Sequence, residues 1–151
     1  MAEGWEGIRV TVVSDPRYLS PIRAVVREAA EIVGLSEEEG TELQLAVQEG
    51  CANVIRHCYR SRPDRRIDLE FNFTGDALVI RIDDYGRFVD PSCIQGRDLE
   101  DVRPGGLGVH FMKKIMDEVT YRRNGWGGTT LTMVKRLRRS GAEGERAGAG
   151  S

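Results

Sequence analysis

The apolar residues of this 151-residue chain change their spacing near residue 60. In residues 19–33 and 43–58 they recur at steps of three and four, which predicts two helices that each bury one face. In residues 67–73 they alternate with polar residues, which predicts a strand with one buried face. Residues 75–76, Gly-Asp, then predict a hairpin turn into a second strand over residues 77–82. The pattern therefore predicts two helices followed by two antiparallel strands.

Capping residues predict where both helices begin. Ser20 is the expected N-cap of the first helix, with Pro21 at its first helical position. Ser36 and Glu39 form the S-x-x-E pattern of a capping box, in which each side chain binds a backbone N–H of the other residue. The second helix is therefore expected to start after Ser36 and to run to about Tyr59.

The rest of the chain predicts further strands, one helix and a long connection. Residues 8–13, 119–123 and 129–135 are the expected strands, and residues 109–116 are the expected third helix. Residues 84–108 are rich in Gly, Pro, Asp and Arg and show no periodicity. Such a long connection within a compact domain is a candidate functional loop.

Charge and composition exclude several classes of function. The chain has 22 Lys and Arg against 24 Asp and Glu, so no basic excess predicts binding to nucleic acid or to an anionic membrane. It has no apolar run of the ~18 residues that span a membrane and no signal-peptide pattern, so we expect a cytoplasmic protein. The three cysteines form no C-x-x-C pair, which predicts reduced thiols. One domain is expected over residues 8–138, between a flexible N-terminus (1–7) and a disordered tail (139–151).

A row of polar residues follows the second predicted helix. Glu49, Asn53 and His57 are spaced four apart, so they line one helix face. The row lies beside the apolar stripe and is expected to meet the edge of the core, where a carboxylate, an amide and an imidazole need partners. Solvated surface residues would show the same spacing. The row is therefore a candidate site that needs a second signal.

Two glycine-containing segments supply such a signal. Asp84 follows the second central strand, where it could accept a hydrogen bond from an amino group, and Gly86 would let a planar ligand approach the backbone. Residues 105–108, Gly-Gly-Leu-Gly, form a loop running into the third helix, where backbone N–H groups and the helix N-terminus favour an anion such as phosphate. Taken alone, the first segment would also fit a turn and the second a hinge.

The order of E-x-x-x-N, D-x-G and GGLG resembles the GHKL (Bergerat-fold) ATP-binding superfamily and, within it, the anti-sigma-factor serine/threonine kinases. The resemblance covers residues 8–137 and includes residues 49–59, which look like E-x-x-x-N-x-x-x-H-x-Y. It implies an α+β Bergerat fold, a two-layer α/β sandwich. In that fold a mixed, mainly antiparallel sheet is covered on one face by about three helices.

The resemblance also implies how the chain would bind ATP. Asp84 would bind the adenine amino group, with Gly86 permitting close approach and Thr129 reaching the same base through its hydroxyl. Asn53 would hold Mg²⁺ through its amide oxygen, which is a suitable hard ligand. The phosphates would be held by the second glycine segment, which consists of Gly105, Gly106, Leu107 and Gly108.

The remaining implied roles concern catalysis and the lid. Glu49, one turn before Asn53, would accept the proton of an attacking hydroxyl. His57 would touch phosphate or make a buried structural hydrogen bond. Residues 91–104 would form a short lid over the nucleotide. Phe88 stands where the family has a second glycine, which removes backbone freedom beside the base or the lid.

Three functions fit the resemblance. The first is a protein serine/threonine kinase that binds Mg-ATP, phosphorylates an anti-anti-sigma (STAS) protein and sequesters a sigma factor, as a homodimer. The second is a non-catalytic ATP-binding module that acts by stoichiometric partner capture, which Phe88 favours. The third is a detached ATPase domain of a histidine-kinase-like sensor. It is disfavoured because the sequence does not show the helical segment with a phosphoacceptor histidine that is expected before such a domain. The kinase is favoured because Glu49 and Asn53 are both present.

Overall fold

One layer of the fold is a five-stranded sheet in the order β1-β2-β3-β5-β4. The computed structural model describes residues 7–88 and 104–138. Within them all four neighbouring strand pairs are antiparallel, where the resemblance implied a mixed sheet. The strands are β1 (Gly7–Val13), β2 (Arg66–Phe73), β3 (Ala77–Asp84), β4 (Glu118–Arg123) and β5 (Thr129–Arg136).

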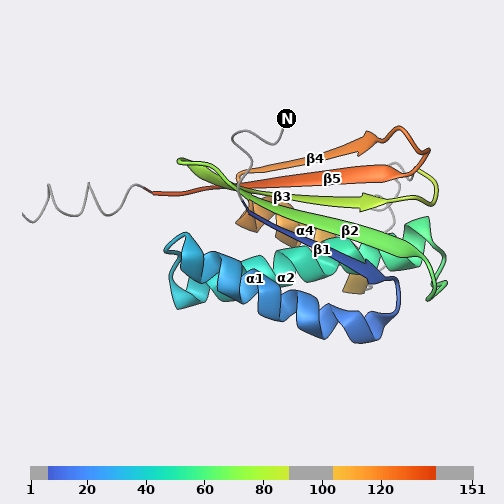
Figure 1. Cartoon of the computed structure of the whole chain (residues 1–151), viewed down its shortest axis with the longest axis horizontal. Helices are drawn as coiled ribbons and strands as arrows, with labels where there is room; N and C mark the ends of the chain where they lie inside the picture. Colours follow the sequence, from blue (N-terminus) through green and yellow to red (C-terminus); the bar gives the residue numbers. More distant parts are fainter. Residues whose placement is uncertain (1–6, 89–103, 139–151) are drawn as a thin grey trace, which may run out of the picture.

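The second layer consists of helices on one face of the sheet (Figure 1). They are α1 (Leu19–Ile32), α2 (Glu37–Asn53) and α4 (Pro104–Ile115). The predicted α+β sandwich with about three helices is thereby confirmed. None of the helices in the described part of the chain combines the length and the apolar character that crossing a bilayer requires.

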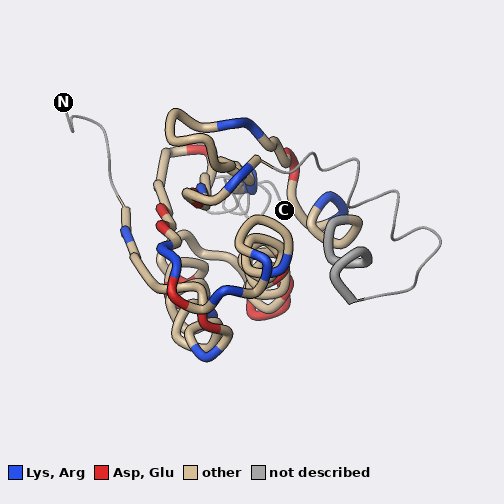
Figure 2. Tube along the Cα trace, turned by 90° about the vertical axis from the view of Figure 1, so that its right-hand side faces the viewer, with Lys and Arg blue, Asp and Glu red and all other residues tan. Residues whose placement is uncertain are grey.

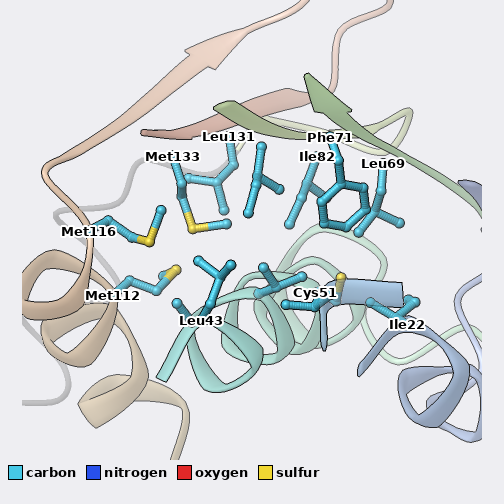
Figure 3. Packing of buried hydrophobic residues seen from close by; sticks show 14 of the residues in the cluster. Ile22, Leu43, Cys51, Leu69, Phe71, Ile82, Met112, Met116, Leu131 and Met133 are labelled. Atoms are coloured by element: carbon cyan, nitrogen blue, oxygen red, sulfur yellow. The ribbon is translucent and has the colours of Figure 1, made fainter. Parts of the chain in front are cut away.

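The core lies between the two layers, where side chains from the sheet meet those from the helices (Figure 3). Phe71 and Ile82 come from the strands and Leu43, Cys51 and Met112 from the helices, and all five are fully buried. The alternation along the strands and the three- and four-residue steps along α2 therefore correctly predicted the buried faces. Burial raises the pKa of the Cys51 thiol to about 12, as expected for a packing cysteine.

Helix α1 begins differently from its prediction. A 3₁₀ turn over Pro16–Tyr18 precedes it, and Asp15 Oδ1 accepts a hydrogen bond from the Arg17 N–H at 2.9 Å. Because this turn continues directly into α1 at Leu19, the residues Ser20-Pro21 lie inside the helix. The predicted cap and first helical position are therefore wrong. The cap-and-proline signal that operates is the one at Asp15, five residues upstream.

Helix α2 begins as predicted, and its end differs in geometry. Ser36 Oγ accepts a hydrogen bond from the Glu39 N–H at 3.1 Å, and Glu39 Oε1 accepts one from the Ser36 N–H at 2.9 Å. After Asn53 the chain continues as a π-helical turn, η2 (Val54–Cys58). The helical segment thus ends just before Tyr59, as predicted, but the spacing did not predict the wider turn. Turns of this type occur frequently at functional sites.

Several predictions fall wholly or partly outside the described residues. Of the predicted flexible N-terminus, residues 1–6 lie outside, and Gly7 is the first residue of β1. The predicted tail over residues 139–151 also lies outside. Of the predicted long connection, residues 89–103 lie outside, whereas the chain from Pro104 onward forms α4.

Replacing Ser36 by alanine is expected to lower the free energy of unfolding by about 1 kcal/mol, because it removes the acceptor for the Glu39 N–H. The matched control is Ser20→Ala, which changes the serine that the sequence suggested as a cap but which lies within α1. We expect the control to change stability by less than about 0.5 kcal/mol. Urea unfolding of both variants measures the difference, and equal losses would contradict the capping assignment.

Candidate functional site

Asp84 is the last residue of β3, and it is fully buried. Its Oδ1 accepts hydrogen bonds from the Gly86 N–H at 3.0 Å and from the Thr129 N–H at 3.2 Å. These bonds join the end of β3 to the start of β5, its neighbour in the sheet. Oδ2 is also buried but has no hydrogen-bond donor among the described residues. A buried acceptor without a donor is costly, so Oδ2 is suited to accept a hydrogen bond from a ligand.

Burial and hydrogen bonds also shift the pKa of the Asp84 carboxyl group. Burial raises the pKa of Asp84 above its ordinary value of 3.8, and the N–H groups of Gly86 and Thr129 oppose that rise. Thr129 is itself buried, and its hydroxyl lies 3.8 Å from the Cys58 thiol. The structure thus brings Asp84 and Thr129 together, in the arrangement that the resemblance implied for an adenine site.

Asp84 and Thr129 line a small cavity of about 20 Å³, together with Asn53 and Tyr121. The Tyr121 hydroxyl is buried and has no hydrogen-bond partner in the described part of the chain. Burial raises the pKa of Tyr121, so this hydroxyl stays protonated and can donate. The sequence analysis missed Tyr121. Its two-residue step from Val119 along the β4 strand is the signal that would have placed both side chains on one face.

Gly86 lies where there is no room for a side chain. A Cβ atom there would come within 2.6 Å of the Cys58 carbonyl oxygen and within 2.9 Å of the Tyr59 ring. The Tyr59 hydroxyl donates a hydrogen bond to the Arg66 carbonyl oxygen at 2.5 Å and accepts one from the Tyr85 N–H at 2.7 Å. Gly86 is therefore needed for the packing of this turn on Tyr59. Close approach of a ligand at Gly86 stays a prediction.

The polar row on α2 lies at the edge of the core, as predicted. Asn53 is buried, and its Nδ2 has no hydrogen-bond partner among the described residues. Glu49 Oε1, one turn earlier, also lacks a hydrogen bond there. The Arg56 Nη2 atom lies 3.4 Å from Asn53 Oδ1 and 3.9 Å from Glu49 Oε1. The sequence analysis missed Arg56, although its three-residue step from Asn53 places it on the same helix face.

Two opposing effects set the proton affinity of Glu49. Burial raises its pKa above the ordinary 4.5, and the positive charge of Arg56 lowers it, with burial the larger effect. A carboxylate with a raised pKa takes up a proton closer to neutral pH. That property suits a general base, and the catalytic role of Glu49 stays a prediction.

The structure gives the positions of the residues expected to contact phosphate, but their contact with phosphate stays a prediction. His57 lies in the π turn and is partly buried, and its role stays a prediction. Residues 105–108 lie within α4, so the predicted loop leading into the helix is wrong for them. Pro104 explains the early start, because its fixed φ suits the first helical position. Since the first N–H groups of a helix have no partner within it, anion binding at this end of α4 stays a prediction.

The side chain of Asn124 links the turn between β4 and β5 to Asp84 through a hydrogen bond. The sequence analysis missed Asn124. Its Nδ2 donates to the Asp84 carbonyl oxygen at 2.8 Å. Its Oδ1 accepts hydrogen bonds from the N–H groups of Trp126 and Gly128, both at 3.0 Å. The turn therefore presents Thr129 to Asp84 in a fixed geometry. An asparagine followed closely by glycines was the available signal, because its side chain commonly bonds to the turn backbone.

Asn124→Ala is expected to lower the free energy of unfolding by about 2 kcal/mol, because three side-chain hydrogen bonds are lost at a partly buried turn. Arg122→Ala, an exposed residue two positions earlier, is the matched control and should change stability by less than about 0.5 kcal/mol. Thermal and urea unfolding measure both. A loss for Asn124→Ala no larger than that of the control would show that the turn does not depend on this side chain.

The raised pKa of Glu49 predicts a pH dependence of stability. The folded state holds the Glu49 proton more tightly than the unfolded state, so the stability gained from that proton is fully present below pH 4.5 and is lost as pH rises through the folded pKa. The stability of the wild type relative to Glu49→Gln should therefore fall from about pH 4 to about pH 7. Urea unfolding at several pH values measures it, and a difference that rose with pH would contradict the assignment.

Two comparisons of sequence place the chain in a known family. A family model described as the histidine kinase-like ATPase domain matches residues 12–135. Serine-protein kinase RsbW of Bacillus subtilis (strain 168) is 28% identical over 138 residues, which cover 86% of this chain and 85% of that protein. Serine-protein kinase RsbW of Bacillus pumilus (strain SAFR-032) is 30% identical over 149 residues, which cover 92% of this chain and 91% of that protein.

A solved structure supports the same fold. The RsbU and RsbW domains of Rv1364c from Mycobacterium tuberculosis align with a TM-score of 0.61 at 18% identity. The alignment covers 89% of this chain and 33% of that longer one, so the chain spans a third of its length. The residues matched by the family model include the pair Glu49 and Asn53 as well as Asp84 and Thr129. The chain therefore belongs to the histidine kinase-like ATPase family and, within it, to the anti-sigma-factor serine/threonine protein kinases.

Proposed function

We propose that this protein uses Mg-ATP to phosphorylate a serine or threonine hydroxyl of an anti-anti-sigma protein with a STAS domain, and that it sequesters a sigma factor. The observation that carries the proposal is the pairing of Glu49 with Asn53 at the edge of the core. Both have buried polar atoms without hydrogen-bond partners in the described part of the chain. The pair places a proton acceptor one helical turn from an amide that suits a hard metal ion.

The cavity at Asp84 supports the binding of adenine. Asp84 Oδ1 is held by two backbone N–H groups, which leaves Oδ2 to accept a hydrogen bond from an exocyclic amino group. The Tyr121 hydroxyl is positioned to donate a hydrogen bond to a ring nitrogen. A cavity of about 20 Å³ holds about one water molecule, so a purine requires it to widen. The donor and acceptor set therefore fits the base, and opening of the cavity accompanies its binding.

Glu49 supports the transfer step. The proton of the acceptor hydroxyl passes to Glu49 Oε1 while the hydroxyl oxygen forms a bond to the γ-phosphorus of ATP. The bond between that phosphorus and its bridging oxygen breaks, and ADP leaves. The Asn53 amide oxygen accepts a hydrogen bond from the Arg56 guanidinium at 3.4 Å. It would exchange that contact for Mg²⁺, which would supply positive charge that stabilises the phosphates. The Arg56 guanidinium also opposes the rise in the Glu49 pKa that burial causes, and so favours the carboxylate form that accepts a proton.

The regulatory part of the proposal is supported by the family. Relatives of similar length are named serine-protein kinases, and the chain matches most of each of them. A kinase of this family that holds one partner at a time would be freed by phosphorylating the antagonist and could then hold the sigma factor. The homodimer that the resemblance implied stays a prediction.

Transfer of labelled phosphate from ATP to the STAS proteins of the same genome tests the proposal. We expect the wild type to label one of them, and Glu49→Gln to do so about 10²–10⁴-fold more slowly because the general base is lost. The variant should keep its affinity for Mg-ATP in calorimetry, since Glu49 does not line the cavity at Asp84. Arg122→Ala, which changes an exposed residue, is the matched control and should retain both properties.

One observation favours the alternative, a non-catalytic module that captures its partner. The ring of Phe88 lies 5.4 Å from the Arg123 guanidinium, which ties the segment after Gly86 to β4. A contact of this kind would reduce the backbone freedom beside Gly86. Wild-type protein that binds Mg-ATP but labels no STAS protein would exclude the kinase. Glu49→Gln protein that kept its full effect on sigma-dependent transcription would support the module.

A further inference from the structure

A second pocket, of about 630 Å³, lies beside the cavity at Asp84. Charges of both signs are distributed around the described trace (Figure 2), but the charged residues that line this pocket are mostly basic. They are Arg60, Arg62, Arg65, Arg66, Arg87 and Asp64. The first three arginines come from the segment between the π turn and β2, Arg66 is the first residue of β2, and Arg87 follows β3. We call this the arginine pocket.

Among the described residues, three of the five guanidinium groups have no carboxylate partner. Arg65 and Arg66 each lie near an aspartate, with N···O distances of 3.8 Å and 3.1 Å. Within residues 7–88 and 104–138, no carboxylate pairs with Arg60, Arg62 or Arg87. Positive charges that line one pocket repel one another, and an anion placed among them relieves that repulsion.

Hydrogen bonds hold the segment that carries Arg60, Arg62 and Arg65, and the start of β2 at Arg66, to the rest of the fold. Ser14 is fully buried, and its hydroxyl donates a hydrogen bond to the Arg62 carbonyl oxygen. The same hydroxyl accepts one from the Arg65 N–H at 3.0 Å, and the Ser14 N–H donates to the Arg65 carbonyl oxygen at 2.7 Å. The Tyr59 hydroxyl holds the Arg66 carbonyl oxygen at 2.5 Å. A segment already held in place loses little backbone entropy when a ligand binds.

The turn that begins this segment is held in an uncommon conformation. Arg60 and Ser61 have φ angles of 51° and 63°, in the left-handed region that residues other than glycine rarely adopt. The Ser61 N–H donates to the Ile55 carbonyl oxygen at 2.6 Å, and the Arg62 N–H donates to the Tyr59 carbonyl oxygen at 3.0 Å. Such a conformation persists where surrounding contacts fix it. The arginine side chains therefore start from a defined backbone.

We propose that the arginine pocket binds a ligand with two or more adjacent phosphate groups. The guanidinium group is a planar fork that binds phosphate oxygens in pairs, and it keeps its charge at all physiological pH values. The volume lies within the range of roughly 300–1,000 Å³ that is typical of small-molecule sites. The arginines converge on one pocket instead of following a helix or a strand. This arrangement favours a compact oligophosphate over an extended acidic peptide.

The arginine pocket is separate from the cavity at Asp84. Tyr59 and Gly86 line the arginine pocket only, whereas Cys58 lines both. The Gly86 N–H is the donor to Asp84 Oδ1, so the two sites are one hydrogen bond apart. A phosphate ligand can therefore bind here while adenine occupies the other cavity. This separation makes the two sites distinguishable by experiment.

Calorimetric titration of pyrophosphate into the full chain, alone and again with saturating adenosine, tests the proposal, because adenosine has the base for the cavity at Asp84 but carries no phosphate. We expect pyrophosphate to bind adenosine-saturated wild-type protein with one site per chain. Arg62→Ala/Arg87→Ala should weaken this binding about tenfold or more for each guanidinium removed, and should leave adenosine affinity unchanged. The matched control, Lys114→Ala/Arg122→Ala, also removes two exposed positive charges and should bind pyrophosphate as the wild type does.

Three outcomes would overturn the proposal. They are the absence of pyrophosphate binding to adenosine-saturated protein, equal binding by the Arg62→Ala/Arg87→Ala variant, and competition between pyrophosphate and adenosine. A glutamate-rich peptide that binds through Arg62 and Arg87 where pyrophosphate fails would assign the pocket to a protein partner instead. Circular dichroism of each variant confirms that it is folded. Because adenosine binding is measured separately, failure of the arginine pocket is distinct from failure of the proposed kinase site.

Two further probes identify the source of the phosphate groups. Inorganic triphosphate and GTP carry the same number of phosphates, and only GTP has a base that can contact the Tyr85 ring in the pocket lining. Tighter binding of GTP supports the proposal and assigns a nucleotide ligand. Equal binding supports it and assigns recognition of phosphate alone. Binding of both probes should weaken as salt is added, since the attraction is between charges.

Discussion

The buried carboxylate of Asp84 is the interaction on which the rest of the site depends, because it joins segments that are distant in the sequence. The N–H of Gly86 and that of Thr129, 45 residues away, both bind its Oδ1. The side chain of Asn124 binds its backbone carbonyl oxygen. All these bonds form where water is scarce, so each is strong when made and costly when broken. One residue therefore sets the position of the end of β3, the start of β5 and the turn before it.

Helix α2 brings Asn53 to the cavity at Asp84 because it approaches the sheet closely. A Cβ atom at Gly50 would lie 2.9 Å from the Leu131 side chain and 3.1 Å from that of Ile82. Gly50 lies between Glu49 and Asn53 in the sequence, so its lack of a side chain lets this part of the helix approach the strands. The row that contains Glu49 and Asn53 thereby lies at the edge of the core. This position explains both the burial of the row and the raised pKa of Glu49.

Sequence patterning predicted most of the fold, because the spacing of apolar residues reports local geometry directly. The capping box at Ser36 was correct for the same reason, since it involves neighbours along one helix. The cap at Ser20 was wrong because an upstream signal of the same kind started the helix earlier. Arg56, Tyr121 and Asn124 were missed for a different reason. Arg56 and Asn124 matter because folding brings them close to their partners, and Tyr121 matters because folding buries its hydroxyl without a partner among the described residues. The spacing of apolar residues carries no information about either effect.

The turn between β4 and β5 carries one of the two tryptophans of the chain at an exposed position. The Trp126 ring is 66% exposed, and its centroid lies 5.2 Å from that of Tyr85 in an edge-on arrangement. Its backbone N–H is held by Asn124, and Tyr85 follows Asp84 directly while lining the arginine pocket. The emission of an indole changes with its contact with water and with a neighbouring phenol. The fold therefore contains an intrinsic fluorophore in contact with Tyr85, which lines the arginine pocket, so that light emission can follow local rearrangement there without any added label.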